Sequence, residues 1–218
     1  MTLFRHFLNL LFPIHCVLCN KTDTYLCNEC SQNIDHPFGI LDGIISVFSY
    51  QDPRIKHLLW RLKFKGTFAI AETFGNYLYD AIMEELSDTL FFDGGVEKIL
   101  LIPIPLSKHR LRDRGFNQAE RLANALYKCG PRLFVVHTNI LIRTKDTPAQ
   151  STIHKRTERK NNVRNCFSIS KMSDVLPYKK SLVIIIDDIA TTGATIYEAQ
   201  KVLKKEGFKK IIGLTVAH

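Results

Sequence analysis

The sequence contains no uninterrupted apolar run long enough to cross a membrane. Its apolar first stretch, residues 1–12, has about half of the ~20 residues that a transmembrane helix needs, and no small-residue cleavage site precedes the cysteines. We therefore expect neither a transmembrane helix nor a signal peptide. The apolar residues of this stretch fall on one helical stripe, which predicts packing against the protein, with shallow docking to a membrane surface or a partner as the alternative.

Two common nucleotide-binding motifs are also missing. No G-x-x-x-x-G-K-[S/T] occurs, which excludes a P-loop, and no G-x-G-x-x-G occurs, which argues against a Rossmann dinucleotide site. Any phosphate-binding loop in this chain must therefore be of another type.

Acidic residues are in deficit. The chain has 21 Asp and Glu against 30 Lys and Arg, so its formal net charge is +9. This excess favours polyanionic partners, which include phosphorylated ligands, nucleic acid and anionic membrane surfaces, and it does not choose among them. A hydrophobic content of 45% over 218 residues indicates a globular protein with one α/β core and a small appendage.

Cysteine is scarce and concentrated near one end of the chain. Four of the six cysteines form the pairs Cys16-x-x-Cys19 and Cys27-x-x-Cys30, a spacing typical of metal ligands rather than of a disulfide scaffold. We predict a structural zinc site in a zinc-ribbon-like module, residues 1–40, which needs the metal to fold in a reducing compartment. A thioredoxin-like redox role is the weaker alternative, because neither pair lies in a strand-to-helix redox loop.

The most informative segment is residues 182–195, LVIIIDDIATTGAT. Its apolar, β-branched run predicts a strand buried on both faces of a parallel sheet, with Asp187 and Asp188 at the strand end. The following loop leads into a helix, so unpaired N–H groups and threonine hydroxyls predict a phosphate site. Carboxylates repel phosphate, so the acids should hold a polyol such as ribose, or Mg²⁺. An ordinary helix cap followed by a turn is the alternative.

This segment resembles the phosphoribosyl pyrophosphate (PRPP) signature of the type I phosphoribosyltransferases. The resemblance implies that Asp187 and Asp188 hold the ribose 2′ and 3′ hydroxyls and form the catalytic pair. It also implies that the loop backbone cradles the 5′-phosphate. The loop residues expected to bind PRPP are Ala190, Thr191, Thr192, Gly193, Ala194 and Thr195.

A second block, residues 99–118, predicts a strand followed by a basic loop. Pro103 ends the expected strand, because proline lacks the N–H that a central ladder needs. The block resembles the pyrophosphate loop of glutamine PRPP amidotransferases, with Ser107 as the best matched residue. Arg112 and Arg114 are expected diphosphate ligands, since a guanidinium offers paired donors; a basic loop that merely flanks the site is the alternative.

The remaining elements were predicted from apolar periodicity and β-branched content. We expect strands over residues 44–50, 141–143, 167–169 and 211–216. We expect helices over residues 54–65 and 69–86, and a further helix whose last part is residues 122–128. Residues 143–171 form a long cationic run that is expected to be mobile.

Basic residues in two of these segments are candidate contacts to single-stranded DNA, although simple solvated charge would look the same. They are Lys56, Arg61, Lys63, Lys65, Lys155, Arg156, Arg159 and Lys160. Nearby aromatic residues are possible stacking platforms, namely Trp60, Phe64, Phe68 and Phe116. For each aromatic residue taken singly, burial in the core is the stronger expectation.

Several motifs occur in the order found in the ComF family of competence proteins, and the chain resembles that family over nearly its whole length. They are the paired C-x-x-C, L-K-F-K-G, P-I-P-L-S with R-G-F-N-Q, T-P-A-Q, and D-D-x-x-T-T-G-A-T. The resemblance implies a type I phosphoribosyltransferase fold over residues 41–218, with a mainly parallel, Rossmann-like sheet flanked by helices. It also implies a flexible loop over residues 143–171 that closes over PRPP bound with Mg²⁺.

The family resemblance implies a role in natural transformation. Its members handle incoming single-stranded DNA on the cytoplasmic side of the inner membrane, alongside a helicase-like translocase and recombination-loading proteins. The alternative is a metabolic phosphoribosyltransferase that transfers the ribosyl group to a nitrogenous acceptor. A reaction of that kind depends on holding the leaving diphosphate, so a missing Ser-His-Asp pattern does not count against it.

Overall fold

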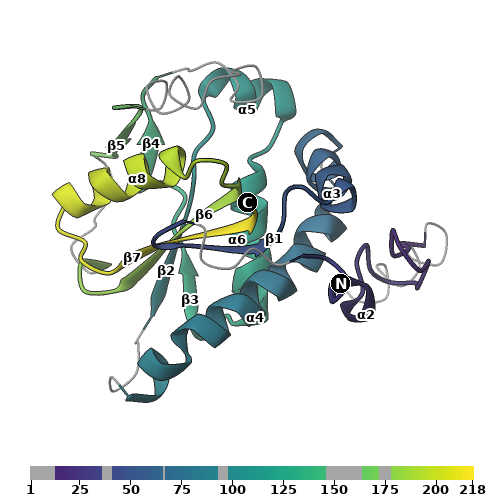
Figure 1. Ribbon diagram of the computed structural model, residues 1–218. Coiled ribbons are helices and arrows are strands. Elements are labelled where there is room, and N and C mark those ends of the chain that lie inside the picture. The colour runs from purple at the N-terminus through teal and green to yellow at the C-terminus, as the bar shows by residue number, and fades with distance from the viewer. Residues whose placement is uncertain (1–12, 36–40, 66, 93–97, 146–163, 172–177) are drawn as a thin grey trace.

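The computed structural model describes residues 13–35, 41–65, 67–92, 98–145, 164–171 and 178–218 (Figure 1). Its helices are α2 (Asn28–Ser31), α3 (Pro53–Phe64), α4 (Phe68–Phe92), α5 (Lys108–Arg114), α6 (Gln118–Cys129) and α8 (Ala194–Lys205). Its strands are β1 (Ile44–Phe48), β2 (Ile99–Pro103), β3 (Phe134–Val136), β4 (Leu141–Arg143), β5 (Phe167–Ile169), β6 (Leu182–Ile189) and β7 (Ile211–Ala217). The expected N-terminal helix, residues 1–12, lies outside the described residues.

A parallel sheet forms the centre of the molecule, with strand order β1-β7-β6-β2-β3. Strand β6 lies in the middle, and its first five residues are buried on both faces, as the β-branched run predicts. Helices flank the sheet, and this confirms the predicted α/β fold with a mainly parallel sheet (Figure 1).

Side chains of β6 alternate between two separate cores. Ile184 and Ile186 pack with α3, α4 and α6 on one face of the sheet. Val183 and Ile185 pack with α8 and the antiparallel β4–β5 pair on the other face. This alternation, which follows from the two-residue period of a strand, also decides where the acidic residues at the end of β6 point.

The segment expected to be a basic loop after β2 is a helix, so that prediction was wrong. The buried Ser107 precedes α5, and its Oγ accepts the N–H of Arg110 at 3.4 Å. Gly115 ends the helix with a left-handed φ of 73°, a conformation that glycine adopts at little cost. A capping serine and a terminal glycine thus enclose a short run of helix-forming residues.

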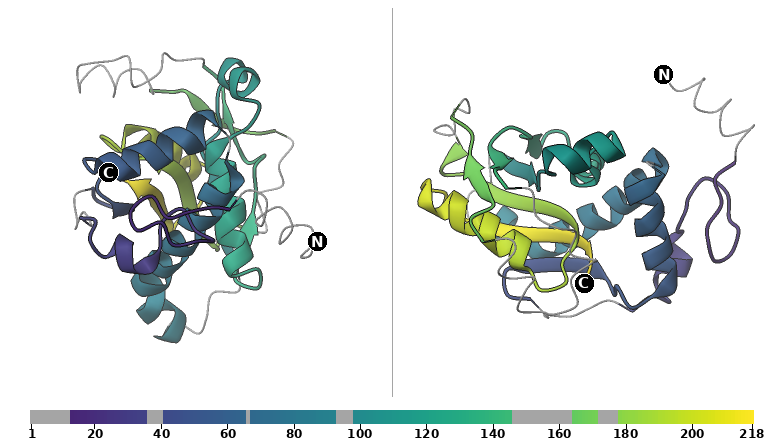
Figure 2. Two further views of the ribbon diagram at one scale, coloured as in Figure 1. Left: turned by 90° about the vertical axis from the view of Figure 1, so that its right-hand side faces the viewer. Right: turned by 90° about the horizontal axis from the view of Figure 1, so that it is seen from above.

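The segment with the paired cysteines lies beside α3 and α4, at the opposite side of the molecule from α8 (Figure 2). Its Leu26 and Ile34 are buried in the same core as α3 and α4. The Tyr77 hydroxyl of α4 donates to the Leu26 carbonyl at 3.2 Å. The cysteine segment therefore shares its core with the main sheet.

Candidate functional site

The candidate site lies where β2 and β6 end, at the carboxyl edge of the sheet, the usual position of ligand sites in parallel α/β folds. Pro103 of β2 pairs with Ile186 of β6, so the segments that follow both strands emerge side by side. The loop that joins β6 to α8 lies at this edge, and α5 follows β2 there (Figure 1). The two blocks singled out in the sequence therefore lie at one edge of the sheet.

Strand β6 continues through both acidic residues, which the sequence had placed at the strand end. Since successive side chains of a strand alternate, Asp187 and Asp188 point to opposite faces. Asp187 lines a hollow formed with the following loop, whereas Asp188 is buried at 4% exposure on the side of α3. The two carboxylates still lie close enough to interact, since each shifts the pKa of the other.

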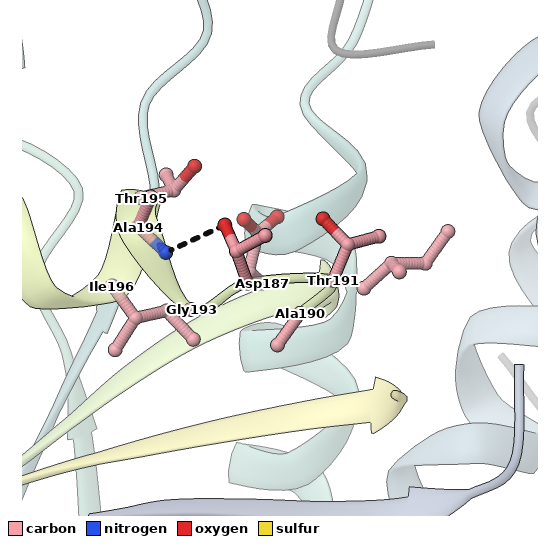
Figure 3. A pocket seen from close by; sticks show the side chains of 9 residues that line it. Asp187, Ala190, Thr191, Gly193, Ala194, Thr195 and Ile196 are labelled. Atoms are coloured by element: carbon pink, nitrogen blue, oxygen red, sulfur yellow. Dashed lines mark hydrogen bonds between the residues drawn. The ribbon is translucent and has the colours of Figure 1, made fainter. Parts of the chain in front are cut away.

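The hollow is small, with a cavity volume of about 10 Å³, and its lining is formed by Asp187 and residues 189–196 (Figure 3). Its wall carries the hydroxyls of Thr191, Thr192 and Thr195. Thr192 Oγ1 accepts the N–H of Ala194 at 3.4 Å, which holds the loop against the start of α8. Among the described residues, the buried Thr191 hydroxyl has no hydrogen-bond partner, so it is suited to bind a ligand oxygen.

Gly193 is the residue that the shape of this loop requires. Its φ is 68°, and a Cβ there would lie 2.5 Å from a ring carbon of Tyr197 and 2.9 Å from Ile44 Cδ1. It occupies the cap position of α8 and has no side chain with which to cap the helix. The positive end of the helix dipole therefore faces the hollow, where an anion is favoured.

A lysine that the sequence had placed on a DNA-binding face belongs to this site. Lys63 Nζ lies 2.7 Å from Asp188 Oδ2, and their side chains are 25% and 6% exposed. Lys63 follows the buried Leu59 by one helical turn, so it lies at the border of the apolar stripe. That position, within the L-K-F-K-G motif, was the available sequence signal, but its partner lies far away in the sequence.

The electrostatics of the three charged groups are unequal. Burial, together with the nearby charge of Asp188, raises the pKa of Asp187 well above its usual value. Burial also opposes ionisation of Asp188, but the Lys63 ammonium outweighs it and lowers the pKa of Asp188. Burial disfavours the Lys63 ammonium, and the attraction of Asp188 outweighs it, so the pKa of Lys63 is raised. Asp188 and Lys63 thus form an ion pair, and Asp187 is the acid whose ionisation burial disfavours.

The residues expected to hold diphosphate are spread around α5. Ser107 is buried and caps the helix, and Arg112 is exposed. Arg114 is half-buried, and its Nη1 donates to Gln118 Oε1 at 3.0 Å. Its positive charge also helps to lower the pKa of Asp188, so Arg114 is electrostatically linked to the site.

The four predicted metal ligands come together. The sulfur atoms of Cys16, Cys19, Cys27 and Cys30 all lie within 4.8 Å of one another, and Sγ of Cys19 is 3.5 Å from Sγ of Cys27. Zn–S bonds of about 2.3 Å put tetrahedral sulfur atoms about 3.8 Å apart, which matches this cluster. Burial raises the pKa of Cys16, but backbone hydrogen bonds at Cys19, Cys27 and Leu18 outweigh it and lower that pKa to about 6. The cluster could therefore hold a metal such as zinc.

The other candidate DNA contacts differ in their surroundings. Lys56 and Lys65 are exposed, whereas Arg61 lies with its guanidinium carbon 4.8 Å from the centre of the Tyr25 ring. Lys155, Arg156, Arg159 and Lys160 lie outside the described residues.

Core burial was the wrong expectation for three aromatic side chains. Trp60, Phe64 and Phe68 are all exposed. Within the described part of the chain, no helix combines the length and apolarity that a membrane span requires.

Comparisons with known proteins agree with the resemblance seen in the sequence. Residues 111–218 match the family model of the phosphoribosyl transferase domain. Over 203 residues the chain is 30% identical to Competence protein F of Haemophilus influenzae, covering 92% of this chain and 82% of that protein. It is 30% identical over 199 residues to Competence protein ComFC of Bacillus subtilis, covering 88% of this chain and 72% of that protein. DNA utilization protein YhgH of Escherichia coli K12 is 27% identical over 206 residues, which are 88% of this chain and 83% of that protein.

Proposed function

Since the chain belongs to the ComF family, we propose that it binds PRPP and handles incoming single-stranded DNA during natural transformation. The observation that carries the PRPP assignment is the hollow at the start of α8. It combines a helix N-terminus, a required glycine and the unpartnered, buried Thr191 hydroxyl beside the Asp187 carboxylate. A ligand that carries both a phosphate and a polyol matches these groups.

In this proposal each group of the site has its own task. The loop backbone and the threonine hydroxyls hold the 5′-phosphate, and Asp187 accepts hydrogen bonds from the ribose hydroxyls. Asp188, whose Oδ2 pairs with Lys63, would complete the ribose contacts through its other carboxylate oxygen. Ser107, Arg112 and Arg114 would lie toward the diphosphate. Mg²⁺, when bound with PRPP, neutralises part of the diphosphate charge.

The cysteine cluster is proposed to hold structural zinc, because four thiolates close the coordination sphere and leave no position for a reaction. Partners would be a competence translocase and recombination-loading proteins, with the chain acting in the cytoplasm, at the inner face of the inner membrane. The names of the relatives in Haemophilus influenzae, Bacillus subtilis and Escherichia coli refer to competence and DNA utilization, and they support the role in competence alone.

Titration of Mg²⁺ and PRPP into the protein by calorimetry tests the ligand assignment. We expect one saturable site, lost in the Asp187→Ala, Asp188→Ala double variant with the fold retained by circular dichroism. Unaltered affinity in that folded variant would refute the role of the acids. Binding of a single-stranded oligonucleotide, measured on the same sample, tests the second part of the proposal.

A second candidate is catalytic transfer of the ribosyl group to a nitrogenous acceptor, which the matched phosphoribosyl transferase domain favours. Incubation with PRPP, Mg²⁺ and a panel of bases should then release pyrophosphate faster than hydrolysis does. No acceptor-dependent release would count against this reading and leave PRPP as a binding ligand.

A further inference from the structure

Large aromatic side chains are exposed on one side of α3 and at the start of α4. The exposed fractions are 49% for Trp60, 57% for Phe64 and 67% for Phe68. Such side chains usually bury most of their surface, because each ring carries a large apolar area. Trp60 and Phe64 lie one helical turn apart, on a face of α3 that the buried stripe of that helix leaves in solvent.

Cations lie over these rings. Lys65 Nζ is 5.9 Å from the centre of the Trp60 ring, and the Arg114 guanidinium carbon is 5.3 Å from that of Phe64. The rings of Trp60 and Phe64 have their centres 5.8 Å apart and are tilted by 44°. Cations from the end of α3 and from α5 therefore lie over the exposed rings of α3.

The same arrangement continues across the turn between α5 and α6. The Arg121 guanidinium carbon lies 3.8 Å from the centre of the Phe68 ring and 3.5 Å from that of Phe116. Only Gly115 separates Arg114, which contacts Phe64, from Phe116. The contacts thus form one aromatic strip, which consists of Trp60, Phe64, Phe68 and Phe116 with Lys65, Arg114 and Arg121.

We propose that this aromatic strip binds single-stranded nucleic acid, with unpaired bases stacked on the exposed rings of Trp60, Phe64 and Phe68 and phosphates on the cations. Base stacking on exposed aromatic side chains with flanking positive charge is how proteins bind single strands without reading sequence. A duplex keeps its base faces covered and would not use the rings. At a membrane surface, cations lie around an apolar face rather than over its rings, so this arrangement favours nucleic acid.

The strip begins beside the proposed PRPP site, because Lys63, which pairs with Asp188, lies next to Phe64 on α3. This inference rests on the proposed function and deepens it, since it assigns the DNA contact to particular side chains. It shifts the emphasis from Lys56 and Arg61 on α3 to the rings and to Arg114 and Arg121.

The chain contains a single tryptophan, and it lies on the strip, so its fluorescence reports directly on this surface. Titration of the protein with a thymidine oligonucleotide should quench Trp60 emission with the same midpoint as fluorescence anisotropy of the labelled strand. Binding without a change in Trp60 emission would place the strand elsewhere and overturn the proposal.

Substitution of the exposed rings tests the contribution of base stacking to binding separately from that of charge. We expect Phe64→Ala with Phe68→Ala to weaken single-strand binding by about tenfold or more while leaving the salt dependence of binding unchanged, because no counterion contact is lost. Phe64→Tyr with Phe68→Tyr keeps the aromatic faces and should bind nearly as well as the parent. Tyr127→Ala removes an exposed aromatic ring from α6 outside the strip and is the matched control.

The outcomes distinguish failure of this inference from failure of the proposed function. If the parent and the double alanine variant bind the single strand with equal affinity, the assignment of the binding site to the strip is wrong, while the proposed handling of DNA is not contradicted. No single-strand binding by the parent overturns both. If the alanine substitutions abolish binding to anionic vesicles and leave oligonucleotide binding unchanged, the strip is a membrane surface and the proposal is wrong. PRPP affinity, measured in parallel, should be the same in the double tyrosine variant, which keeps the ring beside Arg114, and in Tyr127→Ala.

Discussion

At the scale of single residues, neighbours in the sequence have opposite roles. Asp187 and Asp188 are adjacent and chemically identical, yet the pKa of Asp187 is raised and the pKa of Asp188 is lowered. Both carboxylates experience burial, but only Asp188 has the Lys63 ammonium at 2.7 Å. The difference therefore comes from the alternation of β6 and from what α3 places on one side of it.

Removal of Lys63 should destabilise the fold. Lys63→Met leaves Asp188 buried without its partner. We expect the free energy of unfolding to fall by about 2–3 kcal/mol. This loss is smaller than for a fully buried ion pair, because the Lys63 side chain is partly exposed. Urea denaturation measures this loss. Lys65→Met, on the exposed side of the same helix end, is the control; equal losses for both variants would show that the ion pair contributes nothing.

Asp187 should reduce stability at neutral pH. Its folded-state pKa lies above the unfolded value of 3.8, so its contribution to stability is present below pH 3.8 and is lost as pH rises through the folded pKa. Asp187→Asn should therefore raise the melting temperature more at pH 8 than at pH 4, while it abolishes PRPP binding. A variant that melts at the parent temperature at both pH values would contradict the raised pKa.

The Lys63–Asp188 pair contributes stability over a different pH range from that of Asp187. The lowered pKa of Asp188 gives stability that is present above pH 3.8 and lost as pH falls through the folded pKa. The raised pKa of Lys63 gives stability that is complete below pH 10.5 and lost as pH rises through its folded value. This pair therefore does not cause pH dependence near neutrality.

At the scale of elements, the loop between β6 and α8 depends on backbone conformation more than on side-chain chemistry. Its threonines supply hydroxyls, but Gly193 alone permits the turn, because φ is positive and the space for a Cβ is already filled by Tyr197 and Ile44. Another loop with the same hydroxyls and without this glycine would not form the hollow.

Two glycines with the same backbone conformation allow this argument to be tested. Gly115→Ala should cost about 1 kcal/mol, because φ is 73° and no atom lies within 4 Å of the added Cβ. Gly193→Ala should cost about 3 kcal/mol or more, because the same conformational penalty is joined by a clash with packed side chains. Urea denaturation of both variants gives the comparison, and equal costs would mean that the loop relaxes without strain.

At the scale of the whole molecule, the cysteine segment packs into the same core as one face of the sheet. Leu26 and Ile34 are buried in the core that α3, α4 and β6 share. Residues 1–40 were predicted as a distinct module, and their status as a separate domain stays a prediction. Loss of the metal should therefore loosen the packing of α3 and α4 as well as that of the cysteine segment.

We expect Cys16→Ala to release the bound metal and to speed amide hydrogen exchange both in residues 13–35 and in α3 and α4. The reason is that the cysteine turns hold Leu26 and Ile34 in the main core. Elemental analysis and exchange measured by mass spectrometry check both parts. Cys166→Ala, a buried thiol outside the cluster, is the control for removing a sulfur atom; faster exchange limited to residues 13–35 would show that the segment folds independently.

Local patterns in the sequence determined much of the fold and of the candidate site. The β-branched run of residues 182–186 predicted the central strand, the apolar stripe predicted α3, and the cysteine spacing predicted the cluster. Each of these features depends on residues close together in the chain, where strand and helix periods and ligand spacing apply. The fold class followed because a buried run of this kind requires helices on both faces of its sheet.

Tertiary structure alone decided which distant groups meet. Lys63 and Asp188 are far apart in the sequence, and only the packing of α3 against the end of β6 pairs them. The exposure of Phe64 and Phe68 likewise depends on which faces the other helices leave uncovered. Hydrophobic and aromatic composition predicts burial on average, but the surface that remains in solvent is a property of the assembled elements. For this reason the ligand loop and the aromatic candidates could be named from the sequence, whereas the charged partner of Asp188, the exposure of the rings and the cations that lie over them could not.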